Sequence, residues 1–377
     1  MKIGFVLDES FDGTDGVQQY MITLGNWLKS KKHEVYYLVG KTERRDIENI
    51  YSLSRNVRVR FNGNRPSTPL PVSGRKLTKV LKDLNLDVLH VQAPYSPLLA
   101  GGLIKRAPLN TAVVGTFHIM AFSRVARFGS NVLGKMNTNT AKRFDAMMAV
   151  SEPTGEFAAE SFGFSSIVVP CPFLYETFAD ARRVKHAKHA RQRIIFLGRL
   201  VPRKGPMRLL AAIEYLVRNQ LTKEPFEVVI AGKGMQSNEM KKFIQKHSLG
   251  DVVTMVGYLD ESMKPAFLAD SDIAAFPSGN GETFGIALME AMASSRGVVL
   301  GGNNSGYAAV VADKRQLVEH DNPKLFAESI AYWLEHASER KEMASKQQKH
   351  AATFDIESVG PIILRVYEEA LQKRRQS

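Results

Sequence analysis

Short apolar runs alternate along this chain with longer stretches in which apolar residues recur every three or four positions. The run Ile3–Leu7 is short and continuous, as expected of a strand buried on both faces of a parallel sheet. A glycine-containing loop follows it, and apolar residues then keep helical spacing from Val17 to Leu28. The run Glu34–Val39 predicts the next strand. This order of strand, loop, helix and strand is typical of a βαβ unit.

The same alternation continues in two series, each with helical patterns between its strand-like runs. Strands separated by single helices predict a parallel sheet that helices cover on both faces. We therefore expect an α/β fold of two Rossmann-like domains. The further runs of the first series are 88–91, 112–117, 146–150 and 167–169, and those of the second are 194–197, 227–230, 252–256, 273–276 and 298–300.

The domain boundaries are predicted from a change in composition. Residues 181–193 read ARRVKHAKHARQR, a charged stretch without periodicity that is typical of a linker. We therefore expect an N-terminal domain over 1–180 and a C-terminal domain over 194–354. The last segment, 355–377, carries an amphipathic helical pattern, and we expect this helix to return and pack on the N-terminal domain.

The composition is that of a globular protein with a strong basic excess. Of its 377 residues, 44% are hydrophobic and 24% are charged, and the formal net charge is +13. A basic surface favours anionic partners such as nucleic acid, acidic lipids or phosphorylated substrates. The single cysteine, Cys171, excludes an internal disulfide and a cysteine-based zinc site. The first apolar run is too short for a signal peptide, and no stretch reaches the length of a transmembrane helix.

The strongest chemical signal is a pair of glutamates, Glu282 and Glu290, with seven residues between them. Glu282 follows the predicted strand 273–276, and Glu290 lies inside a helix expected to start near Phe284 and Gly285. Amide groups in the first turn of such a helix can bind a phosphate. Carboxylates beside them can accept hydrogen bonds from sugar hydroxyl groups. The alternative is a plain amphipathic helix whose glutamates face solvent.

A second signal follows the predicted strand 194–197. It consists of Gly198, Arg199 and, five residues later, Lys204 just before a predicted helix. Arginine can bind phosphate through two parallel hydrogen bonds, and lysine supplies a compact charge. A diphosphate leaving group needs such neutralisation as its charge develops. The alternative is a basic loop in solvent.

Two weaker signals lie in the N-terminal half. Gly16 precedes a predicted helix, where a glycine lets the backbone approach a phosphate closely, although a simple turn is the better explanation of this glycine taken alone. His118 follows the predicted strand 112–117, and the carboxyl ends of strands face the ligand crevice in α/β sheets. This histidine could bond a sugar hydroxyl group or could be structural.

Together these features resemble the retaining glycosyltransferases of family 4, which share the GT-B fold of two Rossmann-like domains facing across a cleft. The Glu282 and Glu290 pair matches the family's E-x7-E motif, and the segment from Gly198 to Gly205 matches its basic donor-phosphate motif. Within that family, the chain is similar to the phosphatidylinositol mannosyltransferases of actinobacteria over essentially its whole length. The segments that carry this likeness are MKIGFVLDESFDGTDGVQQY, the Phe61-Asn62-Gly63 loop, VVGTFH, GRLVPRKG and GETFGIALMEAMA.

The likeness includes a basic segment before the strand 88–91. Its charges recur at steps of three or four and therefore share one face of a helix, with an apolar side beside them. A basic amphipathic helix suits an anionic membrane surface, and the alternative is a solvated face over a core helix. The basic residues are Arg75, Lys76, Lys79 and Lys82, and the apolar ones are Leu77, Val80, Leu81 and Leu84.

The resemblance implies a role for each site residue. Arg199 and Lys204 would hold the donor diphosphate, with Gly16 beneath it. Glu282 would contact the donor sugar, and Glu290 would contact the nucleotide ribose. The other implied roles are His118 at the donor sugar near the reacting carbon, Lys264 near the base, Gly198, Phe284 and Gly285 in the donor site, and Asn62 with the 75–82 helix toward the acceptor.

The resemblance also implies a reaction. A hexose, mannose from GDP-mannose, would pass with retained configuration to a phosphatidylinositol-type lipid, without a metal or prosthetic group. The enzyme would be cytoplasmic and peripheral on the inner face of the plasma membrane. The alternative is a UDP-sugar donor with diacylglycerol or a soluble acceptor. A nucleic-acid binder or an inactive sensor fits less well, because no aromatic–basic RNA-binding motif is found and both glutamates are present. The oligomeric state is left open.

The chain departs from the family pattern at three places. The stretch Val169–Phe173 reads VPCPF where the family has a Pro-Asn-Gly segment, and Asp15 stands before Gly16 in place of a frequent glycine. The residues after His118, at 119–122, are apolar. These departures weaken the acceptor assignment and leave the donor motifs intact.

Overall fold

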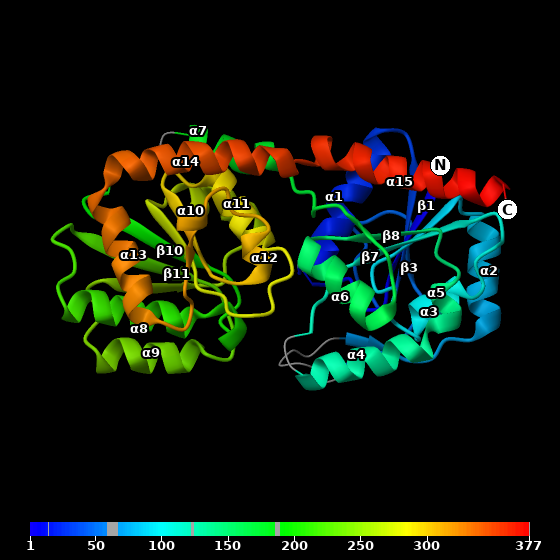
Figure 1. Ribbon diagram of the computed structural model, residues 1–377, viewed down its shortest axis with the longest axis horizontal. Helices are drawn as coiled ribbons and strands as arrows, with labels where there is room; N and C mark the ends of the chain where they lie inside the picture. Colours follow the sequence, from blue (N-terminus) through cyan, green and yellow to red (C-terminus); the bar gives the residue numbers. More distant parts are fainter. Residues whose placement is uncertain (14, 59–66, 122–123, 185–188, 377) are drawn as a thin grey trace. The chain divides into compact units, whose positions relative to one another are not determined.

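The computed structural model describes residues 1–13, 15–58, 67–121, 124–184 and 189–376. The chain divides into two compact units (Figure 1). Unit 1 consists of Met1–Pro172 together with the C-terminal segment Ile356–Ser377, and unit 2 consists of Phe173–Asp355. Each unit is built on its own parallel sheet, so the α/β class and the two Rossmann-like sheets are confirmed.

Unit 1 holds a seven-stranded sheet in the order β3-β2-β1-β6-β7-β8-β9, and every pairing in it is parallel. The order reverses between β1 and β6, which is where ligand crevices form in open α/β sheets. The strands are β1 (Lys2–Leu7), β2 (Glu34–Val39), β3 (Ile50–Ser52), β6 (Val88–Val91), β7 (Ala112–Phe117), β8 (Ala146–Ala149) and β9 (Ile167–Val168).

Helices cover both faces of this sheet, so its strands are apolar on both sides. Helices α1 and α15 pack together on one face, and α15 also contacts β7 and β8. Helices α2 and α3 pack together on the other, over a core that includes Leu38, Leu89 and Val113. The helices are α1 (Gly16–Ser30), α2 (Gly74–Leu84), α3 (Leu99–Ile104), α4 (Arg124–Met136), α5 (Thr138–Ala141), α6 (Glu152–Phe162) and α15 (Ile356–Gln376).

The apolar side of α2 is part of the unit 1 core. Leu77, Leu81 and Leu84 are buried, and Val80 packs against the same core cluster. This side of the helix is therefore not available to a membrane in the conformation seen. The structure thus favours the second interpretation, in which α2 is a core helix with a solvated basic face. Such a helix can bind an anionic surface only through charge attraction.

Unit 2 holds a six-stranded parallel sheet in the order β12-β11-β10-β13-β14-β15. Its order reverses between β10 and β13, which places the ends of these two strands at the second crevice position. The strands are β10 (Gln192–Leu197), β11 (Phe226–Ala231), β12 (Val253–Gly257), β13 (Ile273–Phe276), β14 (Val298–Gly302) and β15 (Leu317–Val318).

Helices α8 and α13 pack together over one main core cluster, which also includes Met240 of α9, and helices α7, α10, α11 and α14 form a second group (Figure 1). The helices are α7 (Tyr175–Arg183), α8 (Pro206–Arg218), α9 (Ser237–Lys246), α10 (Lys264–Ala269), α11 (Ile286–Ser294), α12 (Ser305–Ala308), α13 (Pro323–Glu335) and α14 (Ala337–Ala351), with the 3₁₀ turns η1 (Pro202–Lys204), η2 (Glu261–Met263), η3 (Lys314–Gln316) and η4 (Ala352–Phe354).

The unit boundary differs from the expected one. The expected N-terminal domain ran to residue 180, but the chain enters unit 2 at Phe173. Helix α7 packs against α10 and α11 there, and Arg182 Nη1 donates to the Ala293 carbonyl oxygen at 3.1 Å. The expected linker 181–193 therefore begins inside α7, and its last two residues open β10.

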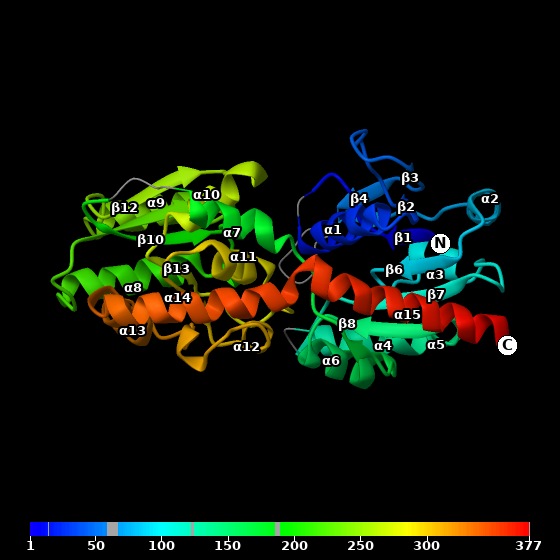
Figure 2. The ribbon, with the colours of Figure 1, turned by 90° about the horizontal axis from the view of Figure 1, so that it is seen from above.

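The C-terminal helix α15 lies against α1 in unit 1 (Figure 2). At this contact Gly360 faces the Trp27 ring so closely that a β-carbon at Gly360 would lie 2.8 Å from it. We expect Gly360→Ala to lower the free energy of unfolding by about 1–3 kcal/mol, because the helices must separate to admit the methyl group. Urea unfolding measures this change.

Gly129 provides the matched control, because it also lies inside a helix but has nothing within 4 Å of a built β-carbon. We expect Gly129→Ala to stabilise the protein by about 0.5–1 kcal/mol, since alanine is the better helix former. Equal unfolding free energies for the two variants would contradict the close packing of α15 on α1.

Candidate functional site

The basic motif lies in the connection between β10 and α8. Gly198 and Arg199 directly follow the strand, and η1 then carries Lys204 up to the helix. Gly205 caps α8 with a φ of +72°, and a β-carbon there would lie 2.0 Å from the Pro277 carbonyl oxygen. Only glycine fits this position. The loop is therefore held against the end of β13, where the glutamate motif begins.

Glu282 is the centre of a compact charge cluster. Its carboxylate is buried and meets the Lys204 ammonium group at 2.9 and 3.0 Å, while Arg203 Nη1 donates to Oε1 at 2.7 Å. Burial acts to raise the pKa of Glu282, but Lys204 and Arg203 outweigh it and hold that pKa below its usual value. Glu282 is therefore ionised at neutral pH and balances one of the two cations.

The cluster carries a positive excess. Burial lowers the pKa of Lys204, with the nearby charges of Arg203 and Arg199 acting in the same direction and Glu282 against it. The Arg199 residue is exposed, and its guanidinium group makes no hydrogen bond or ion pair with the described residues. Two cations thus pair with one carboxylate and a third, Arg199, lies near Lys204, which suits an anionic ligand with more than one charge.

Sequence reasoning missed Arg203. The signal was present, because Arg203 directly precedes Lys204 in the motif. Its guanidinium group also donates to the Gly281 carbonyl oxygen at 3.2 Å, so it ties the basic loop to the loop before α11. Arg203 therefore belongs to the same cluster as the predicted residues Arg199, Lys204 and Glu282.

Glu290 is the second buried carboxylate of unit 2. It lies within α11, and its carboxylate makes no hydrogen bond or ion pair with the described residues. Burial raises the pKa of Glu290 to about 7, with Lys264 opposing the shift and Glu261 adding to it. Lys264 pairs with Glu261 at 2.6 Å. A buried acceptor without a partner is suited to hydroxyl groups of a ligand.

This environment predicts a stability cost that depends on pH. Because the pKa of Glu290 is higher in the folded state, wild-type stability relative to Glu290→Gln falls as pH rises from about 4.5 to about 7 and is level above that. Over this pH range the free energy of unfolding of the wild type should fall by about 3 kcal/mol relative to that of the variant. Urea unfolding of both proteins at pH 5 and pH 8 measures it, and a difference that does not change with pH would contradict the assignment.

The helix start between the two glutamates is set by packing. Gly285 caps α11 with a φ of +92°, and a β-carbon there would lie 2.6 Å from the Tyr307 ring. Phe284 is buried with its ring 5.7 Å from that of Phe354. The helix begins at Ile286, two residues beyond the expected start near Phe284, so its first turn directly follows the loop that carries Glu282.

The N-terminal candidates lie in unit 1. Gly16 is the first residue of α1, and Asp15 caps that helix by accepting a hydrogen bond from the Gln18 amide at 3.4 Å. His118 follows β7, is 8% exposed, and lies 2.8 Å from Gln92 Oε1 through its Nε2 atom. Burial lowers the pKa of His118 to about 3, so its imidazole is neutral at physiological pH.

The acceptor-side candidates are described in part. Asn62 lies outside the described residues. Lys76 donates to the Leu53 carbonyl oxygen at 2.8 Å and is thereby tied to unit 1. The other three basic residues of α2 line a surface hollow of about 830 Å³ together with Arg106. The full lining is Ser73, Gly74, Arg75, Thr78, Lys79, Lys82 and Arg106.

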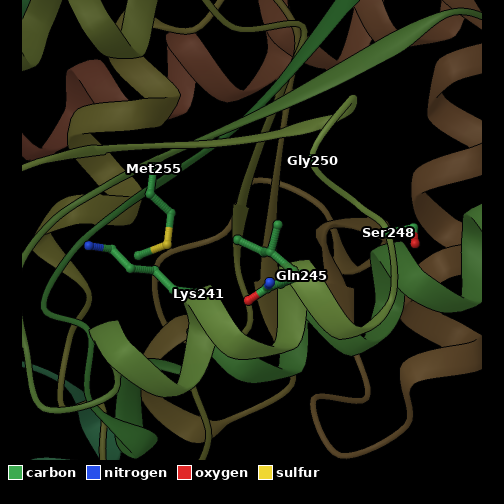
Figure 3. Close-up of a pocket in the computed structure, with 6 residues that line it drawn as sticks. Lys241, Gln245, Ser248, Gly250 and Met255 are labelled. Carbon is green, nitrogen blue, oxygen red and sulfur yellow. The ribbon is translucent and has the colours of Figure 1, made fainter.

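A second hollow of about 490 Å³ lies on unit 2 beside α9 and β12 (Figure 3). Figure 3 shows Lys241 and Gln245 of α9 and Met255 of β12 around it. Its lining contains none of the residues that the sequence predicted. The basic and glutamate motifs predicted for the donor site follow the ends of β10 and β13 instead.

Two family models match the chain. "Glycosyltransferase Family 4" matches residues 14–173, and "Glycosyl transferases group 1" matches residues 178–350. Among solved structures, a glycosyltransferase from Rickettsia africae has a TM-score of 0.75 at 17% identity and covers 98% of this chain and 99% of its own. The Anabaena protein HepE, solved with UDP-glucose, has a TM-score of 0.75 at 18% identity, with coverage of 98% and 99%. The fold is therefore the GT-B fold of these glycosyltransferases.

Curated relatives match over nearly the full length. A phosphatidyl-myo-inositol mannosyltransferase from Propionibacterium freudenreichii is 30% identical over 386 aligned positions, which cover 99% of this chain and 96% of that one. The protein of the same name from Mycolicibacterium smegmatis is 28% identical over 373 positions, with coverage of 98% and 94%. The chain therefore belongs to the glycosyltransferase family that includes the phosphatidyl-myo-inositol mannosyltransferases.

Proposed function

We propose that the protein transfers mannose from GDP-mannose to a phosphatidylinositol-type lipid, with retention of the anomeric configuration. The observation that carries this proposal is the combination, in unit 2, of a cationic cluster around Glu282 with the buried carboxylate of Glu290, which has no hydrogen-bond partner among the described residues. A diphosphate and a ribose are the two features of a nucleotide sugar that such groups recognise. Similarity to mannosyltransferases over nearly the whole chain supports the choice of sugar and acceptor.

The donor roles follow from the chemistry of each group. Arg199 and Lys204 neutralise the diphosphate, and the first turn of α11, entered through Phe284 and Gly285, adds amide donors. Glu282 accepts hydrogen bonds from the donor sugar, and Glu290 accepts them from the ribose. The remaining donor contacts are Lys264 near the base, Gly198 and Gly16 at the diphosphate, and His118 at a sugar hydroxyl group.

The reaction retains configuration by attack on the face from which the leaving group departs. The bond between the anomeric carbon and the diphosphate oxygen breaks, and the acceptor hydroxyl oxygen bonds to that carbon from the same side. The acceptor proton passes to the departing diphosphate. The protein contributes position and charge stabilisation, chiefly through Arg199, Lys204 and the α11 amides.

The acceptor side rests on the basic residues of α2. Arg75, Lys79 and Lys82 are exposed and line one hollow, which suits an anionic lipid surface on the inner face of the plasma membrane. Lys76 and Asn62 complete the acceptor-side set that the family resemblance supplies. Among the described helices, none is both long and apolar enough to cross a bilayer.

Thermal unfolding with a panel of nucleotides tests the donor assignment. GDP and GDP-mannose should raise the melting temperature in proportion to their occupancy, and Glu290→Ala should abolish the shift. A shift with UDP and UDP-glucose alone would favour the alternative of a UDP-sugar enzyme. No shift with any of the four would contradict the donor site itself.

A further inference from the structure

Two buried histidine pairs lie next to one another on one face of the unit 1 sheet. His90 of β6 is joined to Thr116 of β7 at 2.6 Å, and two residues further along the same strands Gln92 is joined to His118 at 2.8 Å. Residues two apart point to the same face of a strand, so all four side chains face α1 and α15. The first pair lies inside the sheet, and the second lies at the strand ends.

The first pair is closed by neighbouring tyrosines. Tyr367 of α15 bonds His90 Nδ1 at 2.7 Å, so both ring nitrogens of His90 are used within the protein. Tyr20 of α1 bonds the Thr116 hydroxyl group and packs edge-on against the His118 ring at 4.9 Å. This pair has no atom left for a ligand, which is the pattern of a structural contact.

In the second pair, each side chain has one polar atom without a partner in the described part of the chain. Gln92 Oε1 can only accept, so His118 Nε2 must carry the proton of that hydrogen bond. In a neutral imidazole the other nitrogen, Nδ1, is then an unprotonated acceptor, and it makes no hydrogen bond within the described part of the chain. The Gln92 amide nitrogen is also buried without a partner there, which is rare unless a site has a use for the residue.

We propose that Gln92 is a positioning residue for His118: it holds the imidazole as the Nε2-protonated form and leaves Nδ1 to accept a hydrogen bond from a hydroxyl group of the sugar substrate. This inference rests on the proposed function, in which His118 contacts the donor sugar. Gln92 itself does not touch the substrate. The adjacent His90–Thr116 pair shares the same face and chemistry but performs no such role.

Nitrogen-15 spectra of the full chain, labelled at histidine, test the inference without any activity. The His118 resonances are identified from their loss in His118→Gln. The wild type should show a protonated Nε2 and an unprotonated Nδ1, and Gln92→Leu should lose this preference. A wild type with the proton on Nδ1 would overturn the inference, because Gln92 would then have to donate through its nitrogen.

Steady-state kinetics of mannose transfer from GDP-mannose to phosphatidylinositol vesicles provide a second test, which measures activity. Gln92→Leu should lower kcat by about tenfold with KM changed less than about twofold, since one oriented hydrogen bond is lost. Thr116→Val is the matched control: it should leave kcat within about twofold but lower the melting temperature by about 2–4 °C, because His90 and Tyr20 lose their shared partner. An unchanged kcat in Gln92→Leu would overturn the inference.

Gln92→Glu gives a pH profile that a merely structural role would not produce. A carboxylate at this position raises the pKa of His118. In the protonated ring Nδ1 carries a proton and can no longer accept a hydrogen bond from the sugar. The kcat of this variant should therefore be low near pH 6 and recover as pH rises. Burial raises the pKa values of Tyr20, Tyr367 and Cys171 and lowers that of His90, so these neighbours stay neutral throughout. A profile parallel to that of the wild type would overturn the inference.

The two proposals fail in different ways. A wild type that transfers no sugar but shows the predicted spectrum would remove the proposed function and leave the Gln92–His118 pairing in place. If the wild type transfers the sugar and the Gln92→Leu variant is fully active, the proposed function stands and the positioning role of Gln92 is removed.

Discussion

Lys204→Met is expected to lower kcat/KM for GDP-mannose by about 10²- to 10³-fold. The ammonium group of Lys204 contacts both carboxylate oxygens of Glu282, and in the proposed site it stabilises the charge that develops on the departing diphosphate. Because that charge is largest in the transition state, kcat should fall more than donor affinity. Initial-rate kinetics over a range of donor concentrations separates the two.

A loss of activity could also arise because Glu282 is left with Arg203 alone. The double variant Lys204→Met/Glu282→Gln distinguishes the two causes, because it removes both members of the ion pair. If Lys204 acts on the diphosphate, the double variant is at least as inactive as Lys204→Met. Recovery of activity in the double variant would show that Lys204 serves only to balance Glu282. Lys246→Met, which removes an exposed lysine of α9, should leave kcat/KM within about twofold.

Reversing the charges of α2 is expected to reduce binding to anionic vesicles by at least about 10²-fold. Each basic residue near an anionic surface contributes about 1 kcal/mol, and Arg75, Lys79 and Lys82 are all exposed on one hollow. Sedimentation of the triple glutamate variant with phosphatidylinositol-containing vesicles measures the loss. Because Leu77 and Leu81 lie in the core, α2 can attract the membrane only through its charges. We therefore expect vesicle binding by the wild type to be strongly weakened by salt.

Helix α9 supplies a control of equal charge change. Lys241, Lys242 and Lys246 are exposed on unit 2, and their reversal changes the net charge by the same amount as the α2 variant. We expect this control to retain most of its vesicle binding. Equal losses in the two variants would mean that net charge, and not α2, governs the attraction.

Most of the sheet framework was predictable, because buried parallel strands leave continuous apolar runs. The runs 34–39, 88–91, 112–117 and 273–276 coincide with β2, β6, β7 and β13. Most strands of two or three residues could not be found in this way, although the run 167–169 did predict β9. The missed ones are β3, the small antiparallel pair β4 (Asn56–Arg58) and β5 (Ser67–Pro69), and β15.

Helix α7 shows why the boundary between the two units lies before the predicted one. Its sequence, YETFADARR, is mostly polar and buries only Phe178 and Ala179, so it gives little periodic signal beside the charged stretch that follows. What fixes it to unit 2 is contact with α10 and α11, which are distant in sequence. Such a tertiary preference cannot be read from local composition.

The donor-side residues were predictable as a set, but their mutual contacts were not. Spacing identified Arg199, Lys204, Glu282 and Glu290, and the structure brings the first three into one cluster. Spacing could not show that Arg203 turns toward Glu282, because the direction of a side chain in a 3₁₀ turn depends on its neighbours in space. The opposite environments of Glu282 and Glu290 likewise follow from packing alone.

The most direct test is transfer of radiolabelled mannose from GDP-mannose to phosphatidylinositol in vesicles by the purified chain. The account predicts a mannosylated phosphatidylinositol whose new linkage has the anomeric configuration of the donor, and a rate of product formation about 10²- to 10³-fold lower for Lys204→Met under the same conditions. A labelled lipid formed from UDP-glucose but not from GDP-mannose, or a product of inverted configuration, would contradict it.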